Sequence, residues 1–134
     1  MITGAMVAAE AMSWIGTPWH RNASLKGVGA DCVGVVAGTA LALGLPVKYR
    51  NDYPQVPDGS LARELSAQCT AIAALEPGAV LLMTFTAVPH HVGIYTGEGI
   101  VHAYAQVRRC VFSPWEDYWR AKVRRIFRLP GVTP

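Results

Sequence analysis

Apolar and polar positions follow a helical period in the first half of the chain. Residues 7–15 place apolar side chains at the spacing of one helix face, and Gly16-Thr17-Pro18 indicates where that helix ends. A second helix is expected over residues 32–43, with Asp31 as its N-cap and Gly44 as its stop. The first half is therefore predicted to supply helices.

Two stretches between these elements lack any period and are expected to be loops. Residues 19–30 mix glycines with polar side chains, and residues 45–58 are rich in Pro, Asp and Tyr. A short helix is expected over residues 60–68, because Ser60 and Glu64 stand near a capping arrangement.

Strand-type composition begins after the turn dipeptide Pro77-Gly78. The expected strands cover residues 80–84, 91–96, 99–104, 107–112 and 123–129, with one or two helical turns over 114–120. Helices first and an antiparallel meander second predict an α+β fold, in which N-terminal helices pack on a central antiparallel sheet. With 134 residues, the chain is expected to be one domain over residues 1–134.

Basic residues gather in the last quarter of a chain whose net charge is only +3. They are Arg108, Arg109, Arg120, Lys122, Arg124, Arg125 and Arg128. Such an end can meet an anionic polymer, either nucleic acid or teichoic-acid-bearing wall, or it can be the solvated face of strands and a helix. No aromatic-interleaved motif accompanies it, which favours the solvated face and predicts no nucleic-acid partner.

The cysteine count and the N-terminal sequence bear on where the chain works. Three cysteines, an odd number, argue against a secreted disulfide framework. The N-terminus lacks the basic start and apolar run of a signal peptide, and no stretch approaches the ~20 apolar residues of a membrane span. We therefore expect synthesis and folding in the cytoplasm, with no membrane span and with delivery by something other than a signal peptide.

Cys32 is the candidate nucleophile because it falls at the expected start of a helix. The partial positive charge there stabilises a thiolate and lowers the thiol pKa, and free backbone N–H groups can hold an oxyanion. The alternative is a small apolar residue that packs against the sheet. Position alone does not separate the two interpretations.

His91 and His102 favour the catalytic interpretation. A two-residue turn at Gly97-Glu98 suits a type II′ hairpin, which places Gly93 opposite His102. Both imidazoles then share one face, with room between them over Gly93. One can contact the thiol while the other orients it. A three-residue loop would instead send the histidines to opposite faces.

No metal or cofactor is expected. His90 should point away from the face of His91, and nothing has C-x-x-C or H-x-x-x-H spacing, so a zinc site is disfavoured. Cys69 and Cys110 have no nearby histidine in the sequence and are expected to be packing residues.

Five short motifs, taken together and in order, resemble the NlpC-like cysteine peptidases. The resemblance is specifically to short phage-type members associated with tail assembly and passage through the cell wall. The motifs are Trp14-Ile15-Gly16-Thr17-Pro18-Trp19, Asp31-Cys32-Val33-Gly34-Val35-Val36, Pro77-Gly78, His91-Val92-Gly93-Ile94-Tyr95 and Val101-His102-Ala103.

The resemblance implies a papain-like fold with Cys32 as nucleophile, His91 as base and His102 as the orienting third residue. It implies hydrolysis of peptidoglycan stem peptides, usually at the bond from γ-D-glutamate to a diamino acid. It also assigns Asp31 to the substrate's amine, a role that competes with helix capping. Phage tail proteins are the implied partners, and a phage or phage-like tail is the implied carrier to the wall.

The chain departs from the family pattern near the expected substrate pocket, for which the predicted binding residues are Trp19, Asp31, Val33 and Gly34. Trp19 replaces a tyrosine, Val33 a serine and Ala79 an aspartate. The indole N–H of Trp19 can replace the lost hydroxyl as a donor, or the ring can simply close the core beneath its loop.

Three interpretations follow in order of preference. The first is a cell-wall endopeptidase that forms an acyl-enzyme on Cys32. The second is an amidase or acyltransferase with the same nucleophile. The third is a non-enzymatic tail-assembly or wall-binding module on a peptidase scaffold, since a fold alone does not prove a function.

Overall fold

The computed structural model describes residues 1–134, which form four helices and a six-stranded antiparallel sheet beside a small two-stranded sheet. The helices are α1 (Gly4–Met12), α2 (Cys32–Ala42), α3 (Ser60–Gln68) and α4 (Asp117–Lys122). The strands are β1 (Ser24–Leu25), β2 (Gly29–Ala30), β3 (Thr70–Ile72), β4 (Val80–Met83), β5 (His91–Tyr95), β6 (Gly99–Tyr104), β7 (Arg109–Pro114) and β8 (Val123–Arg128). This is the α+β architecture that the sequence predicts.

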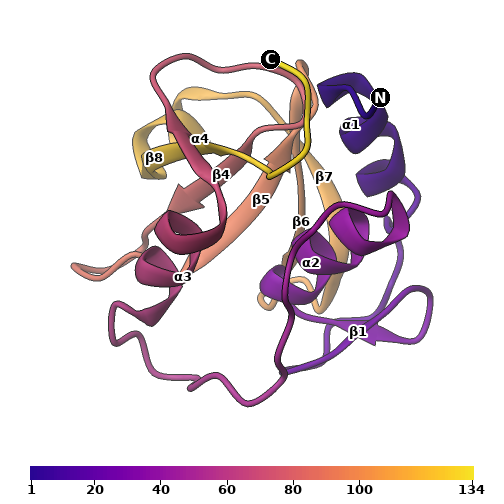
Figure 1. Ribbon diagram of the computed structural model, residues 1–134. Helices are drawn as coiled ribbons and strands as arrows, with labels where there is room; N and C mark the ends of the chain where they lie inside the picture. Colours follow the sequence, from indigo (N-terminus) through magenta and orange to yellow (C-terminus); the bar gives the residue numbers. More distant parts are fainter.

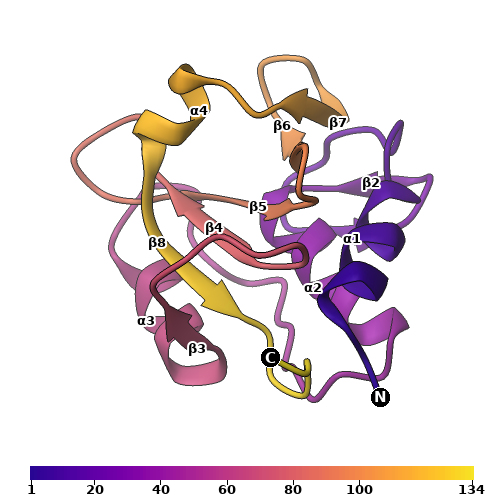
Figure 2. The same cartoon turned by 90° about the horizontal axis from the view of Figure 1, so that it is seen from above.

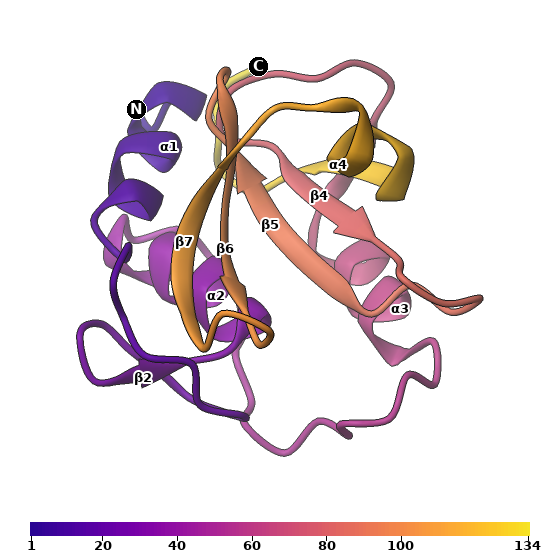
Figure 3. The same cartoon turned by 180° about the vertical axis from the view of Figure 1, so that it is seen from behind.

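Strands β4 to β7 form the expected meander, and β8 then returns to the other side of β4. The order across the large sheet is β3-β8-β4-β5-β6-β7. Figure 3 shows β4 to β7 side by side, with α2 behind the sheet, where it packs on β5 and β6, and with α1 beyond β7. Helix α4 makes the return possible because it lies at the start of β8, as Figure 2 shows.

The sheet buries two unequal apolar clusters. The larger one packs α1 and α2 against the sheet, and its fully buried members include Val7, Val35, Val92, Ile94 and Val101. The smaller one lies on the other face and contains Leu81, Met83, Ile100 and Trp119 of α4. Because strand residues alternate between faces, His91 and His102 lie on the second face while their neighbours fill the main core.

Several element boundaries differ from the sequence prediction. Helix α1 ends at Met12, because Trp14 turns inward and packs against Gly38, where an added Cβ would lie 2.3 Å from the indole. Strand β7 begins at Arg109 because the chain first makes a turn in which Arg108 has a φ of 61°.

Three further differences involve short elements. The expected loop over residues 19–30 contains the paired strands β1 and β2, and β3 was not predicted because three residues carry no usable period. Gly59, with a φ of 86°, is the N-cap of α3, so the expected capping role of Ser60 is wrong. None of the helices is long and apolar enough to cross a membrane.

Candidate active site

Cys32 is the first residue of α2, and Asp31 caps that helix as predicted. The Asp31 Oδ1 accepts a hydrogen bond of 2.8 Å from the backbone N–H of Gly34. Gly34 is required there, since an added Cβ would lie 1.9 Å from the carbonyl oxygen of Ala23. The cap therefore fixes where the helix begins, and it leaves the Cys32 side chain at the helix N-terminus.

The pKa of the Cys32 thiol is raised to about 12, mainly by burial and then by the neighbouring Asp31 carboxylate. Backbone N–H groups of Val92 and Val33 act in the opposite direction without overcoming those two causes. The prediction of a lowered pKa from the helix start alone is therefore wrong. The thiol is protonated at neutral pH, so any nucleophilic role requires a base.

The hairpin that carries the histidines has the predicted register. Ile94 pairs with Val101, and the backbone N–H of Thr96 donates to the carbonyl of Gly99 over 2.9 Å, which closes a two-residue turn. Gly97, the first residue of that turn, has a φ of 101°, as a type II′ turn requires. Both imidazoles consequently share one face of the sheet.

The two imidazoles are hydrogen-bonded to each other. The Nε2 of His91 lies 2.7 Å from the Nδ1 of His102, and the ring planes meet at 67°. Gly93 makes this approach possible, since an added Cβ would lie 3.1 Å from the His102 Cβ and 2.4 Å from the Cγ2 of Ile100. The expected room over Gly93 is thus present and is used by the histidine pair.

Both histidines are neutral at pH 7. Burial, followed by the neighbouring rings of His102 and His90, lowers the pKa of His91 well below its ordinary value. Burial also lowers the pKa of His102 to about 4. Because the Nε2 of His91 already faces His102, its Nδ1 is the nitrogen left to receive a proton from another group.

Ser113 extends the hydrogen-bonded series, and sequence reasoning missed it. Its Oγ lies 2.8 Å from the Nε2 of His102, so the bonds run from His91 through His102 to Ser113. The sequence signal lies only in the β6–β7 register, which pairs Val111 with His102 and sets Ser113 two residues further on the same face. None of these bonds includes the Cys32 thiol.

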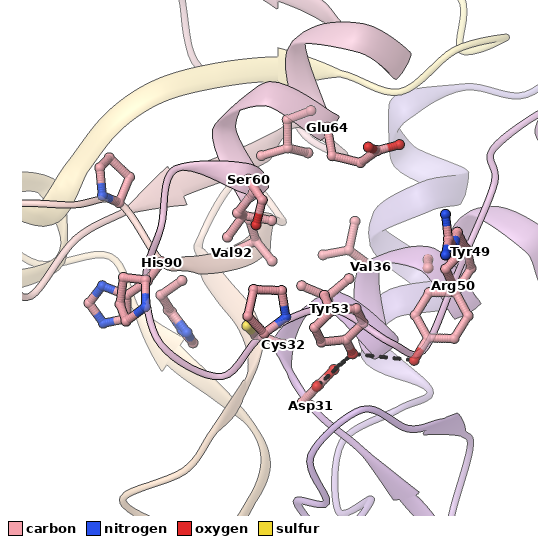
Figure 4. A pocket seen from close by; sticks show the side chains of 18 of the residues that line it. Asp31, Cys32, Val36, Tyr49, Arg50, Tyr53, Ser60, Glu64, His90 and Val92 are labelled. Carbon is pink, nitrogen blue, oxygen red and sulfur yellow. Dashed lines mark hydrogen bonds between the residues drawn. The ribbon is translucent and has the colours of Figure 1, made fainter.

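Cys32 and His91 line the same cavity, which has a volume of about 830 Å³. Its lining includes three of the predicted substrate-binding residues, Trp19, Asp31 and Val33. Gly34 is not part of the lining. In Figure 4, Cys32 lies on the cavity wall with Asp31 and Tyr53 on one side and His90 on the other.

Residues 46–59, here called the strap, cover one side of this cavity. The strap runs from α2 to α3 along the lower edge of Figure 1. The Tyr53 hydroxyl lies 2.6 Å from both carboxylate oxygens of Asp31, and the Asn22 side chain donates to the carbonyls of Asn51 and Tyr53. Burial, followed by the bond to Asp31, raises the pKa of Tyr53.

The Asp31 carboxylate thus accepts hydrogen bonds from three groups. Besides Tyr53, the Oδ2 of Asp31 accepts a bond of 2.7 Å from the backbone N–H of Asn22, and its Oδ1 accepts the capping bond from Gly34. Figure 4 shows the Tyr53 hydroxyl between Asp31 and Tyr49. A ligand amine that binds Asp31 must therefore displace or share the Tyr53 hydroxyl.

Comparison with known proteins gives a consistent fold. No family model and no curated protein matches the sequence. Among solved structures, NlpC2 from Trichomonas vaginalis superposes with a TM-score of 0.74 at 17% identity, over 94% of this chain and 46% of that one. The NlpC/p60 domain of the peptidoglycan hydrolase SagA superposes with a TM-score of 0.66 at 22% identity, over 96% of this chain and 100% of that domain. The peptidoglycan hydrolase RipB from Mycobacterium tuberculosis superposes with a TM-score of 0.67 at 17% identity, over 93% of this chain and 63% of that one.

The chain has the NlpC/P60 fold. It spans the whole of the SagA domain but less than half of NlpC2. The papain-like architecture expected from the sequence motifs is therefore confirmed.

On this NlpC/P60 fold, the other cysteines and histidines lie outside the hydrogen-bonded series of His91, His102 and Ser113. Cys110 is fully buried in the main core, as predicted, and the partly buried Cys69 packs against that core and also lines the cavity. His90 borders the cavity and donates through Nδ1 to the carbonyl of Val88, and His20 is exposed outside it. No group of three His, Cys, Asp or Glu side chains is arranged to hold a metal ion.

Proposed function

We propose that the protein is a cysteine peptidase that hydrolyses stem peptides of bacterial peptidoglycan. The observation that carries the proposal is the buried, neutral His91–His102 pair, of which His91 lines the same cavity as Cys32. Proteins with this fold that are named peptidoglycan hydrolases, SagA and RipB, support the substrate class.

The reaction begins with a neutral thiol and a neutral base. The Nδ1 of His91 takes the proton from Cys32 as the sulfur attacks the scissile carbonyl carbon. Backbone N–H groups at the start of α2 receive the oxyanion. His91 then gives its proton to the departing amine as the C–N bond breaks, which leaves a thioester on Cys32. A water molecule, deprotonated by His91, hydrolyses that thioester and restores the thiol.

The finer assignments come from the sequence motifs. We propose that the scissile bond joins γ-D-glutamate to a diamino acid and that Asp31 binds the substrate's amine. Trp19 and Val33 border the same cavity and are proposed to shape substrate preference. We further propose that a phage or phage-like tail carries the protein from the cytoplasm to the wall, with tail proteins as partners.

Hydrolysis is tested with synthetic stem peptides and with purified peptidoglycan, the products being identified by mass spectrometry. The wild-type protein is expected to split the γ-D-glutamyl bond, and Cys32→Ala to release no product while keeping its circular dichroism spectrum. Cys69→Ala is the matched control, because it removes a thiol from the same cavity and is expected to leave turnover intact. Turnover that survives in Cys32→Ala contradicts the mechanism.

The products also separate the alternatives. The second candidate is an amidase or acyltransferase with the same nucleophile, and the pocket residues Trp19 and Val33, which border the cavity, would decide between the reactions. An amidase releases an intact peptide from its sugar, and an acyltransferase gives a product extended by the acceptor. A binding module gives neither product, and its Cys32 forms no acyl-enzyme.

A further inference from the structure

The hydrogen-bonded series that runs from His91 through His102 ends at the hydroxyl of Ser113. His102 has no exposed surface, and its Nε2 lies 2.8 Å from the Oγ of Ser113. Aromatic rings occupy the space around the imidazole, with Trp119 at 4.8 Å and Tyr104 stacked at 5.2 Å between ring centroids. Ser113 is thus the hydrogen-bond partner that the structure provides for this nitrogen.

The direction of the hydrogen bonds follows from the reaction that His91 must perform. When the Nδ1 of His91 takes a proton, both of its nitrogens carry hydrogen. The Nδ1 of His102 must then accept from His91, which leaves the hydrogen of His102 on its Nε2. That hydrogen points at Ser113, whose oxygen must accept it. Only one arrangement of protons is compatible with a charged His91.

The reverse arrangement blocks the reaction. If Ser113 donates to the Nε2 of His102, then His102 donates from Nδ1 to the Nε2 of His91. The hydrogen of neutral His91 then lies on Nδ1, where no lone pair remains for the thiol proton. The tautomer of His102 therefore decides whether His91 can act as a base.

We propose that Ser113 is a positioning residue that holds His102 in the Nε2–H tautomer, and this inference rests on the proposed peptidase function. Ser113 does not touch the reacting atoms; it acts through His102. Alanine at this position would leave a buried N–H without an acceptor, so His102 would shift toward the Nδ1–H tautomer, which is the blocked arrangement. Threonine keeps the hydroxyl and is expected to keep the arrangement.

Nitrogen-15 NMR of histidine-labelled protein tests this directly, because long-range 1H–15N correlations identify which ring nitrogen carries hydrogen. We expect Nε2–H at His102 in the wild type and in Ser113→Thr, and a growing Nδ1–H population in Ser113→Ala. Val111→Ala is the control: Val111 faces His102 across the β6–β7 ladder without a polar side-chain atom, so its loss should leave the tautomer unchanged.

Kinetics on a stem peptide give the second readout. Ser113→Ala loses the hydrogen bond to His102, so kcat should fall about tenfold with KM unchanged. Ser113→Thr keeps the hydroxyl and should retain most of the wild-type kcat. An Nδ1–H tautomer in the wild type, or an unchanged tautomer in Ser113→Ala, overturns the proposal. The tautomer is measured without turnover, so a wild type with the expected tautomer that cleaves no stem peptide refutes the peptidase function instead.

Discussion

The Nε2 of His91 and the Nδ1 of His102 lie 2.7 Å apart, and both side chains are buried. The contact is a product of one hairpin: the turn at Gly97 sets the register, and Gly93 opens the space between the rings. The geometry of one hairpin therefore brings together two of the three proposed catalytic groups without a contact from a distant segment.

Gly93→Ala should disrupt this pair. A Cβ at position 93 meets the side chain of Ile100 at 2.4 Å and the Cβ of His102 at 3.1 Å, so Ile100 has to move and the His102 side chain has to give way slightly. We expect a loss of about 1–3 kcal/mol in the free energy of unfolding, together with most of the hydrolytic activity. Urea denaturation and peptide cleavage measure the two effects.

Gly27→Ala is the matched control for that variant. Gly27 also has a backbone unsuited to alanine, with a φ of 77°, but an added Cβ there meets nothing within 4 Å. Stability should fall through backbone strain, by about 1 kcal/mol, while the activity of the folded protein stays unchanged. Equal losses of activity in the two variants would show that the room over Gly93 is not what activity depends on.

Replacing the histidines one at a time should reveal their separate roles. His91→Ala removes the base and should lower kcat by about 10²–10⁴-fold. His102→Ala removes only the group that orients the base, so a smaller loss of kcat is expected than in His91→Ala. Steady-state kinetics decide the order, and a larger loss in His102→Ala would mean that the two roles are exchanged.

The site was predictable where local geometry decides it. The Asp31 cap and the helix start at Cys32 depend on neighbours within three residues, and the histidine register depends on a two-residue turn. The α+β order of elements follows from helical period in the first half and from strand-type composition and turn residues in the second. These features need no knowledge of how distant segments meet, and the structure confirms them.

The features of the site that sequence reasoning missed depend on distant contacts. The strap has no hydrophobic period, and its place is set by hydrogen bonds from Tyr53 and Asn22 that span 22 and 31 residues. Ser113 becomes a partner of His102 only through the register of β7, which a turn at Arg108 delays. The raised pKa of Cys32 comes from burial that no sequence pattern reports.

The lowered pKa of His102 predicts that the protein loses stability in mild acid. The folded-state pKa is about 4 and the ordinary value is 6.5, so the unfolded chain binds the extra proton first. Stability is therefore complete above pH 6.5 and falls as the pH drops toward 4, by on the order of 3 kcal/mol from this residue. His91 acts in the same direction, because its pKa is also lowered.

Urea denaturation at several pH values between 7 and ~4 measures that loss. His102→Gln should flatten the dependence by removing one titrating group, even if the variant is less stable at pH 7. Stability that does not change between pH 6.5 and 4 would contradict a buried neutral His102.

Tyr53 should control access to Asp31. Its hydroxyl lies 2.6 Å from both carboxylate oxygens, which also accept backbone hydrogen bonds from Gly34 and Asn22. If a substrate amine binds this carboxylate, Tyr53→Phe removes its competitor and should lower KM by about fivefold, the equivalent of one hydrogen bond, with kcat unchanged.

Tyr49→Phe separates this effect from a general loosening of the strap. The Tyr49 hydroxyl lies 3.3 Å from that of Tyr53 and makes no bond to Asp31, so its loss should leave KM unchanged. Substrates without a free amine should show no change in either variant, because they gain nothing from an unoccupied carboxylate. A raised KM in Tyr53→Phe, seen only with amine-bearing peptides, would instead make Tyr53 part of the amine site, with its hydroxyl orienting Asp31 toward the ligand.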